Sequence, residues 1–126
     1  MCGIIGLVKK EAFSSDEALQ MLKRLEYRGY DSFGIATDNG LLEKEVGEIK
    51  IIKSIDCNLA ISHCRWATHG GVTKANAHPH KDCTGNIVLV HNGIIENYLE
   101  MKKQLPDHTF SSETDTEVIA HYLEEK

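Results

Sequence analysis

The sequence is poor in aromatic residues and proline, and it has no long hydrophobic run. Aromatic residues make up 6% of its 126 residues and only two prolines occur. No low-complexity or Pro/Gly-rich tract suggests a linker or a disordered segment. The longest apolar runs, residues 4–8 and 87–90, are too short to cross a bilayer, and no secretory signal precedes them. We therefore expect a cytoplasmic protein with no membrane partner.

Clusters of basic residues are missing as well. The net charge is -5 and the lysines and arginines are spread along the chain, so no basic patch is available to neutralise nucleic-acid phosphates. We therefore expect no nucleic-acid partner. An apolar content of 41% and a charged content of 26% are typical of one small globular domain.

No CxxC pair occurs among the four cysteines, which without an export signal are expected to be reduced thiols. A metal-binding module is one alternative, because thiolate and imidazole side chains are zinc ligands. Its candidate ligands fit no common zinc spacing. They are Cys57, Cys64, Cys83, His63, His78 and His80. We therefore predict no metal and no organic cofactor.

Short β-branched or alternating segments, bounded by turn residues, predict a strand-rich chain. The alternation within residues 58–66 predicts that one face of that strand meets a core. Asn39-Gly40 predicts a tight antiparallel hairpin, because such turns need positive φ values. The predicted strands are residues 2–8, 34–37, 41–46, 58–66 and 86–91.

Three helices are predicted to frame these strands. The first covers residues 16–27, the second covers residues 97–105 and stops before Pro106, and the third begins near Thr114. Their predicted apolar faces are Ala18, Met21, Leu22 and Leu25 in the first, and Val118, Ile119, Tyr122 and Leu123 in the third. Capping-box spacing relates Ser14 to Glu17 and Thr114 to Glu117. The third helix has no C-cap signal, so we expect the domain to continue beyond residue 126.

Cys2 is the first candidate for chemistry. If Met1 is removed, Cys2 carries a thiol and an α-amino group of ordinary pKa about 8, so nucleophile and base share one residue. The amine can take the thiol proton and return it to a departing group. Position alone also fits a small buried side chain at the start of a strand.

Six segments together resemble the class II glutamine amidotransferases with an N-terminal cysteine nucleophile. Within that family, the sequences of these segments are most similar to the glutaminase domain of the glucosamine-6-phosphate synthases. The segments are CGIIG (residues 2–6), LEYRGYDS (25–32), RWATHG (65–70), NAHPH (76–80), HNGIIEN (91–97) and SETDTEVIAH (112–121). The resemblance implies an α+β fold, the four-layer α/β/β/α sandwich of N-terminal-nucleophile hydrolases with antiparallel sheets, incomplete in this chain.

The resemblance also assigns roles to residues that bind and polarise glutamine. Arg65 would hold the substrate α-carboxylate through a bidentate fork, and Thr68 and His69 would complete that cradle. Asp115 would face the α-ammonium group. Asn92 and the backbone of Gly93 would form the oxyanion hole. Taken singly, Arg65 also fits a solvated surface arginine, and Asn92-Gly93 also fits an ordinary turn. Asp115 also fits an aspartate that interacts with the dipole of a helix N-terminus.

Further residues are implied to support this site. The resemblance makes Arg28, Tyr30 and Asp31 organisers of the loop around the nucleophile, and it makes Trp66 part of a gate to an ammonia tunnel. Two positions differ from the usual sequence of the family, and both differences are expected to alter packing only. Phe33 stands where a small residue is common, and Cys64 stands where threonine is common.

The function implied is glutamine hydrolysis to glutamate and ammonia, with the ammonia used to make glucosamine 6-phosphate from fructose 6-phosphate. Residues 1–126 are then the N-terminal portion of a glutaminase domain, without the isomerase domains that form its partner in the whole enzyme. An acceptor of the amidophosphoribosyltransferase or glutamate synthase class and an inactive binding relative stay open as alternatives. The oligomeric state is also left open, a homo-oligomer included.

Overall fold

The computed structural model describes residues 1–68 and 70–126 and has an α+β architecture. One antiparallel sheet contains four strands in the order β1-β4-β2-β3, and a second contains β5 and β6. The strands are β1 (Gly3–Ser14), β2 (Ser32–Thr37), β3 (Leu42–Val46), β4 (Asp56–Arg65), β5 (His80–Lys81) and β6 (Val88–Leu89). The helices are α1 (Asp16–Lys23), α2 (Tyr98–Lys103) and α3 (Glu117–Glu124), with a 3-10 turn over Glu26–Arg28. Among the described residues, no helix is long and apolar enough to cross a membrane.

The large sheet brings the amino end of the chain beside the end of β4. β1 runs antiparallel to β4, with Gly3 opposite Cys64 and Leu7 opposite Ala60. Gly3 begins the strand immediately after Cys2, so the register holds Cys2 next to the residues that follow Arg65. Sheet pairing thus positions the candidate nucleophile.

The β2–β3 hairpin confirms the antiparallel pairing predicted from Asn39-Gly40. Its turn differs in detail, because only Gly40 has a positive φ, of 91°. The backbone N–H of Thr37 donates to the carbonyl of Leu41, and that of Gly40 donates to Thr37. A three-residue loop with glycine in the left-handed position therefore joins the strands.

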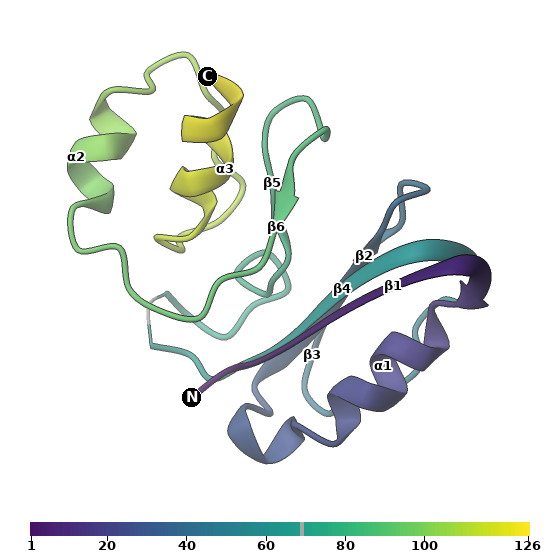
Figure 1. The fold of residues 1–126 in the computed structure, drawn as a ribbon. Coiled ribbons are helices and arrows are strands. Elements are labelled where there is room, and N and C mark those ends of the chain that lie inside the picture. The colour runs from purple at the N-terminus through teal and green to yellow at the C-terminus, as the bar shows by residue number, and fades with distance from the viewer. Residues whose placement is uncertain (69) are drawn as a thin grey trace.

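The main core lies between the large sheet and α1, which packs against β1 and β4 (Figure 1). In β4, Ala60, Ser62 and Cys64 face this core, as the alternation predicted for one face of the strand. Phe33 and Cys64 lie directly opposite each other on β2 and β4, and both are fully buried. They are the two residues that differ from the usual family sequence. The cluster comprises Phe13, Ala18, Leu19, Leu22, Phe33, Ile35, Leu41, Ile49, Cys57, Ala60 and Cys64.

The second half of the described chain stands beside the opposite face of the sheet. The two halves approach closely at Gly34, because a Cβ there would lie 2.1 Å from the carbonyl oxygen of His78. α3 packs against β5 and α2 (Figure 1). The segment before α3 is thereby carried toward the end of β4 and the amino end of the chain.

Several predicted boundaries were wrong. β1 continues to Ser14 and β5 was not predicted, whereas the strand predicted over residues 86–91 is only Val88–Leu89. The predicted first helix is divided into α1 and the 3-10 turn, and α3 begins at Glu117. Tertiary pairing set these limits, since strand ends depend on partners distant in sequence.

Both predicted capping boxes were also wrong. Ser15 and Thr116 are the N-cap residues, and neither makes a side-chain capping hydrogen bond. The buried faces of α1 and α3 also differ from the predicted apolar faces. Leu19 is buried in α1 while Met21 is 38% exposed, and in α3 Ala120 and His121 are buried while Tyr122 and Leu123 are exposed.

Candidate active site

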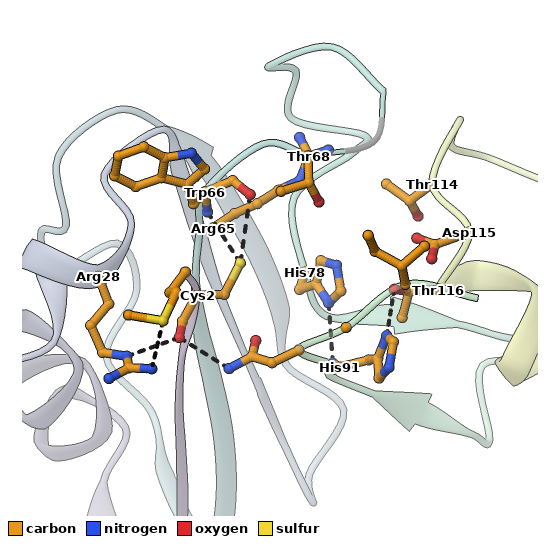
Figure 2. A pocket seen from close by; sticks show the side chains of 14 residues that line it. Cys2, Arg28, Arg65, Trp66, Thr68, His78, His91, Thr114, Asp115 and Thr116 are labelled. Carbon is orange, nitrogen blue, oxygen red and sulfur yellow. Dashed lines mark hydrogen bonds between the residues drawn. The ribbon is translucent and has the colours of Figure 1, made fainter. Parts of the chain in front are cut away.

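A cavity of about 370 Å³ lies where the amino end, the end of β4 and the segment before α3 meet. Figure 2 shows Cys2 and Asp115 on opposite sides of it, with Arg65 and Thr68 along one edge. Eight predicted site residues line the cavity, namely Cys2, Arg28, Arg65, Trp66, Thr68, Asn92, Gly93 and Asp115. Tyr30 and Asp31 stand behind this lining, and His69 lies outside the described residues.

The sulfur of Cys2 is held against the backbone of Trp66. The N–H of Trp66 donates to Cys2 Sγ at 3.2 Å, and the thiol lies 3.6 Å from the Trp66 carbonyl oxygen. Met1 also lines the cavity, so the α-nitrogen of Cys2 is a peptide nitrogen until Met1 is removed.

Asn92 and Arg28 both donate to the carbonyl oxygen of Cys2. The distances are 3.1 Å from Asn92 Nδ2 and 3.2 Å from Arg28 Nε. The amide oxygen of Asn92 lies 2.9 Å from His63 Nε2. Cys2 engages one of the two hydrogens on Asn92 Nδ2, and no acceptor among the described residues engages the second.

His63 fixes the orientation of the Asn92 amide. Because Asn92 Nδ2 is a donor, its Oδ1 is the acceptor and His63 Nε2 must carry the proton. Burial lowers the pKa of His63 from 6.5 to about 4, so the ring is neutral at pH 7. Its Nδ1 is buried with no hydrogen-bond partner among the described residues. The ring stacks on His78, with 4.0 Å between centroids.

Gly93 requires glycine for two reasons. Its φ is 154°, and a Cβ would lie 2.7 Å from His91 Nε2. His91 is itself held by Thr116, with 3.2 Å between His91 Nδ1 and Thr116 Oγ1. The backbone at Gly93 can therefore face the cavity without a side chain in the way.

Arg65 ends β4 and is almost fully buried. Its Nη1 donates to the carbonyl of Gly71 at 2.9 Å, and its Nη2 lies 3.5 Å from that of Gly70. These contacts fix the plane of the guanidinium at the cavity wall. A planar fork in a fixed orientation suits bidentate recognition of a carboxylate.

Asp115 lies two residues before α3 and is 4% exposed. The backbone N–H of Ile95 donates to Asp115 Oδ2 at 2.6 Å. This bond ties the HNGIIEN segment to the SETD segment, which lie on neighbouring parts of the cavity wall. A carboxylate opposite the arginine gives the cavity both charges needed to bind a free α-amino acid.

A family profile for a glutamine amidotransferase domain matches residues 1–126. The chain belongs to the glutamine amidotransferases. Three curated relatives, each named glutamine–fructose-6-phosphate aminotransferase (isomerizing), show the extent of the similarity. The chain is 52% identical to the one from Pyrococcus horikoshii over 99% of its length. It is 48% identical to those from Methanothermobacter thermautotrophicus and Streptococcus mutans, over 98% of its length in each case. It spans only 22–23% of the length of these relatives.

In this amidotransferase chain, Asp31 organises the segment that carries Arg65 and Trp66. Its N–H donates to the carbonyl of Arg65 at 3.1 Å, and Asp31 Oδ2 accepts from the N–H of Ala67 at 2.8 Å. Tyr30 contacts the Trp66 ring edge-on, with 5.7 Å between centroids. Both residues contact the segment of residues 65–67 and do not line the cavity themselves.

Sequence reasoning missed His63, His78 and His91 as parts of the amidotransferase site. His63 and His78 had been considered only as metal ligands, and among the described residues the proposed set of three cysteines and three histidines does not form one cluster. Burial lowers the pKa of His78 strongly, with a further effect from His63. Signals were available, because His78 and His91 lie in the NAHPH and HNGIIEN segments and His63 lies on β4 two residues before Arg65.

Proposed function

We propose that Cys2, freed by removal of Met1, hydrolyses glutamine at this cavity. The observation that carries the proposal is the position of Cys2 Sγ, 3.2 Å from the Trp66 N–H at the edge of a cavity that Arg65 and Asp115 also line. Arg65 would bind the α-carboxylate of glutamine, assisted by Thr68 and His69, and Asp115 would bind its α-ammonium group. The side-chain carboxamide would then reach toward Cys2.

The reaction follows from these positions. The Cys2 thiolate attacks the carboxamide carbon, and the resulting oxyanion is stabilised by Asn92 Nδ2 and the Gly93 N–H. The α-amino group of Cys2 takes the thiol proton and passes it to the nitrogen as the C–N bond breaks, so ammonia leaves. Water then cleaves the γ-glutamyl thioester and glutamate is released. No metal or organic cofactor takes part in these steps.

The larger context is proposed from the relatives. The chain would be the N-terminal portion of a type-2 glutaminase domain with the four-layer α/β/β/α sandwich, and ammonia would pass Trp66 to an isomerase domain. The printed names of the relatives support fructose 6-phosphate as the acceptor and glucosamine 6-phosphate as the product. Of the two substrates, we expect only glutamine to bind within residues 1–126.

A glutamine-mimicking electrophile tests the proposal. Incubated with a folded, Met1-free preparation, it should label Cys2 alone in peptide mass maps, and excess glutamine should protect. Burial raises the pKa of Cys57 and Cys64, so neither should react. Cys83 is exposed and lies away from the cavity, so it serves as the internal control thiol.

Labelling of Cys83 at the same rate as Cys2, or labelling that glutamine does not slow, would contradict the proposal. A Cys2→Ser variant should lose both the label and the release of ammonia from glutamine. A Met1-free chain that takes the label but releases no ammonia would instead indicate a binding relative without activity.

A further inference from the structure

A second cluster of reactive side chains lies outside the cavity, where three segments meet. It contains Cys83 from the β5–β6 turn, His108 from the loop after α2, and His121 and Glu124 from one face of α3. Figure 1 shows α3 beside the β5–β6 hairpin with α2 on its other side. One ligand atom from each of the four residues lies within 4.8 Å of all the others.

The spacing of these atoms fits a tetrahedron around one small ion. Cys83 Sγ lies 3.6 Å from His108 Nδ1 and 3.4 Å from His121 Nδ1, and the two Nδ1 atoms are 3.1 Å apart. Glu124 Oε2 lies 3.1 Å and 3.5 Å from the same two nitrogens. Tetrahedral zinc bonds separate neighbouring nitrogen or oxygen ligands by about 3.3 Å, and sulfur from nitrogen by about 3.6 Å.

The opposite nitrogen of each histidine ring meets a carboxylate. His108 Nε2 lies 2.7 Å from Glu125 Oε1, and His121 Nε2 lies 3.4 Å from Glu117 Oε1. This is the arrangement of metal-bound histidines, whose second ring N–H is usually held by a carboxylate. Each carboxylate can accept the ring proton at Nε2, which leaves the Nδ1 lone pair for an ion when Cys83 and Glu124 are ligands as well.

The backbone N–H of Cys83 donates to Glu124 Oε2 at 3.0 Å, and the other groups at the centre are ring nitrogens and a sulfur. Two Nδ1 atoms, a carboxylate oxygen and a sulfur converge, while His121 is 1% exposed and Glu124 20% exposed at the side chain. Converging acceptors in a partly dry site repel one another unless a cation lies among them. Exposure of Cys83 gives an ion access from solvent.

We propose that Cys83, His108, His121 and Glu124 bind one Zn²⁺ ion. A thiolate with two imidazoles selects zinc over the hard cations magnesium and calcium, which take oxygen ligands. Four protein ligands close the coordination sphere, which is typical of a structural site. The ion would join the β5–β6 turn, the loop after α2 and the carboxyl-terminal half of α3.

The site also bears on the cavity, because α3 directly follows Asp115 and Thr116. Zinc would anchor α3 at its far end and so stabilise the segment that lines the cavity. The cluster shares no residue with the cavity lining, so the ion would have no part in the reaction itself. Metal binding can therefore be tested whether or not the proposed hydrolysis is correct.

Metal content is the first measurement. The chain should be loaded with zinc, passed through a desalting column and analysed by elemental mass spectrometry, and about one zinc per chain is expected. Cys83→Ser and Glu124→Gln should each lose it. Cys2→Ser is the matched control, because it removes a thiol outside the cluster and should keep the full zinc content. Circular dichroism of each variant verifies that it is folded.

Two measurements on the unsubstituted chain do not depend on variants folding. Loaded with cobalt(II), it should show the visible bands of a tetrahedral ion and a thiolate charge-transfer band, and X-ray absorption of the zinc form should give one sulfur and three nitrogen or oxygen ligands. A chelator should lower the midpoint of thermal unfolding by about 10 °C, and zinc should restore it. Substoichiometric zinc with no change of the unfolding midpoint would overturn the proposal and leave a metal-free ion-pair network. Retention of zinc by Cys83→Ser would do the same.

Discussion

The side-chain amide nitrogen of Asn92 lies 3.1 Å from the carbonyl oxygen of Cys2, a residue 90 positions earlier in the chain. The bond fixes the amide beside the candidate nucleophile, and His63 fixes it from the other side. One side chain therefore joins the amino end of β1 to the segment after β6. Its orientation determines where an oxyanion could be stabilised.

Replacing Asn92 should act on turnover. Asn92→Asp keeps an acceptor for His63 but removes the amide donor, and it should lower kcat for glutamine hydrolysis by about 100- to 1000-fold with little change in KM. Asn86→Asp, in the exposed β5–β6 turn, is the control and should leave kcat unchanged. Steady-state ammonia release measures both. Equal small effects of the two changes would show that Asn92 is an ordinary turn residue.

Replacing Arg65 should act on substrate binding instead. Lysine keeps the charge but cannot make the planar fork that the carbonyls of Gly70 and Gly71 orient, so Arg65→Lys should raise KM for glutamine by about tenfold or more. Arg24→Lys is the matched surface change, because Arg24 is exposed. A KM that does not distinguish the two variants would argue against carboxylate binding at Arg65.

Gly93→Ala should destabilise the chain and lower its activity together. The new Cβ would lie 2.7 Å from His91 Nε2 at a φ of 154°, and strain of this kind costs about 1–3 kcal/mol. Gly40→Ala is the control, because Gly40 also has a positive φ but has open space around a Cβ. Urea unfolding should give a larger loss for Gly93, and only that variant should lose ammonia release.

His63 should make stability depend on pH. In the native state burial holds its pKa at about 4, against 6.5 for the free side chain. As the pH falls below about 6.5, only the unfolded chain takes up this proton, so stability decreases until about pH 4, where the native state is protonated too. The full effect is on the order of 3 kcal/mol, present above pH 6.5 and lost below pH 4.

The comparison uses His63→Gln, which keeps a donor for Asn92 but does not titrate. Urea midpoints of this variant should fall less steeply between pH 6.5 and pH 4 than those of the unsubstituted chain. The groups around the ring are Arg65, His78, His91 and Asn92. Parallel slopes would mean that His63 is protonated in the folded chain.

Local patterns predicted much of the large sheet and of the cavity lining. The hairpin at Gly40 follows from turn chemistry. Arg65, Asn92 and Asp115, which line the cavity, lie in segments whose resemblance to the family predicted them as site residues. β5 could not be predicted, because its two residues are a strand only through pairing with β6. Likewise, the neutral state of His63 arises from burial by segments that are distant in sequence.

The proposed zinc ligands illustrate the same limit. The sequence offered Cys57, Cys64, Cys83, His63, His78 and His80 as candidate metal ligands, a set that fits no common zinc spacing. Of these, Cys57 and Cys64 are buried in the core beneath the sheet. Cys83 and His108 are far apart along the chain, with no template that relates them. Only the packing of α3 against β5 and α2 brings them together.

The pairing of β1 with β4 also sets an order of events during synthesis. The amino-terminal strand leaves the ribosome first, yet its partner begins at Asp56 and the residue that holds the carbonyl of Cys2 is Asn92. At about 5–20 residues per second, β4 is complete roughly 3–13 s after synthesis begins, and Asn92 is added after roughly 5–18 s. Met1 precedes β1 and is 75% exposed in the folded chain, so an aminopeptidase can reach it both before and after the strand pairs with β4.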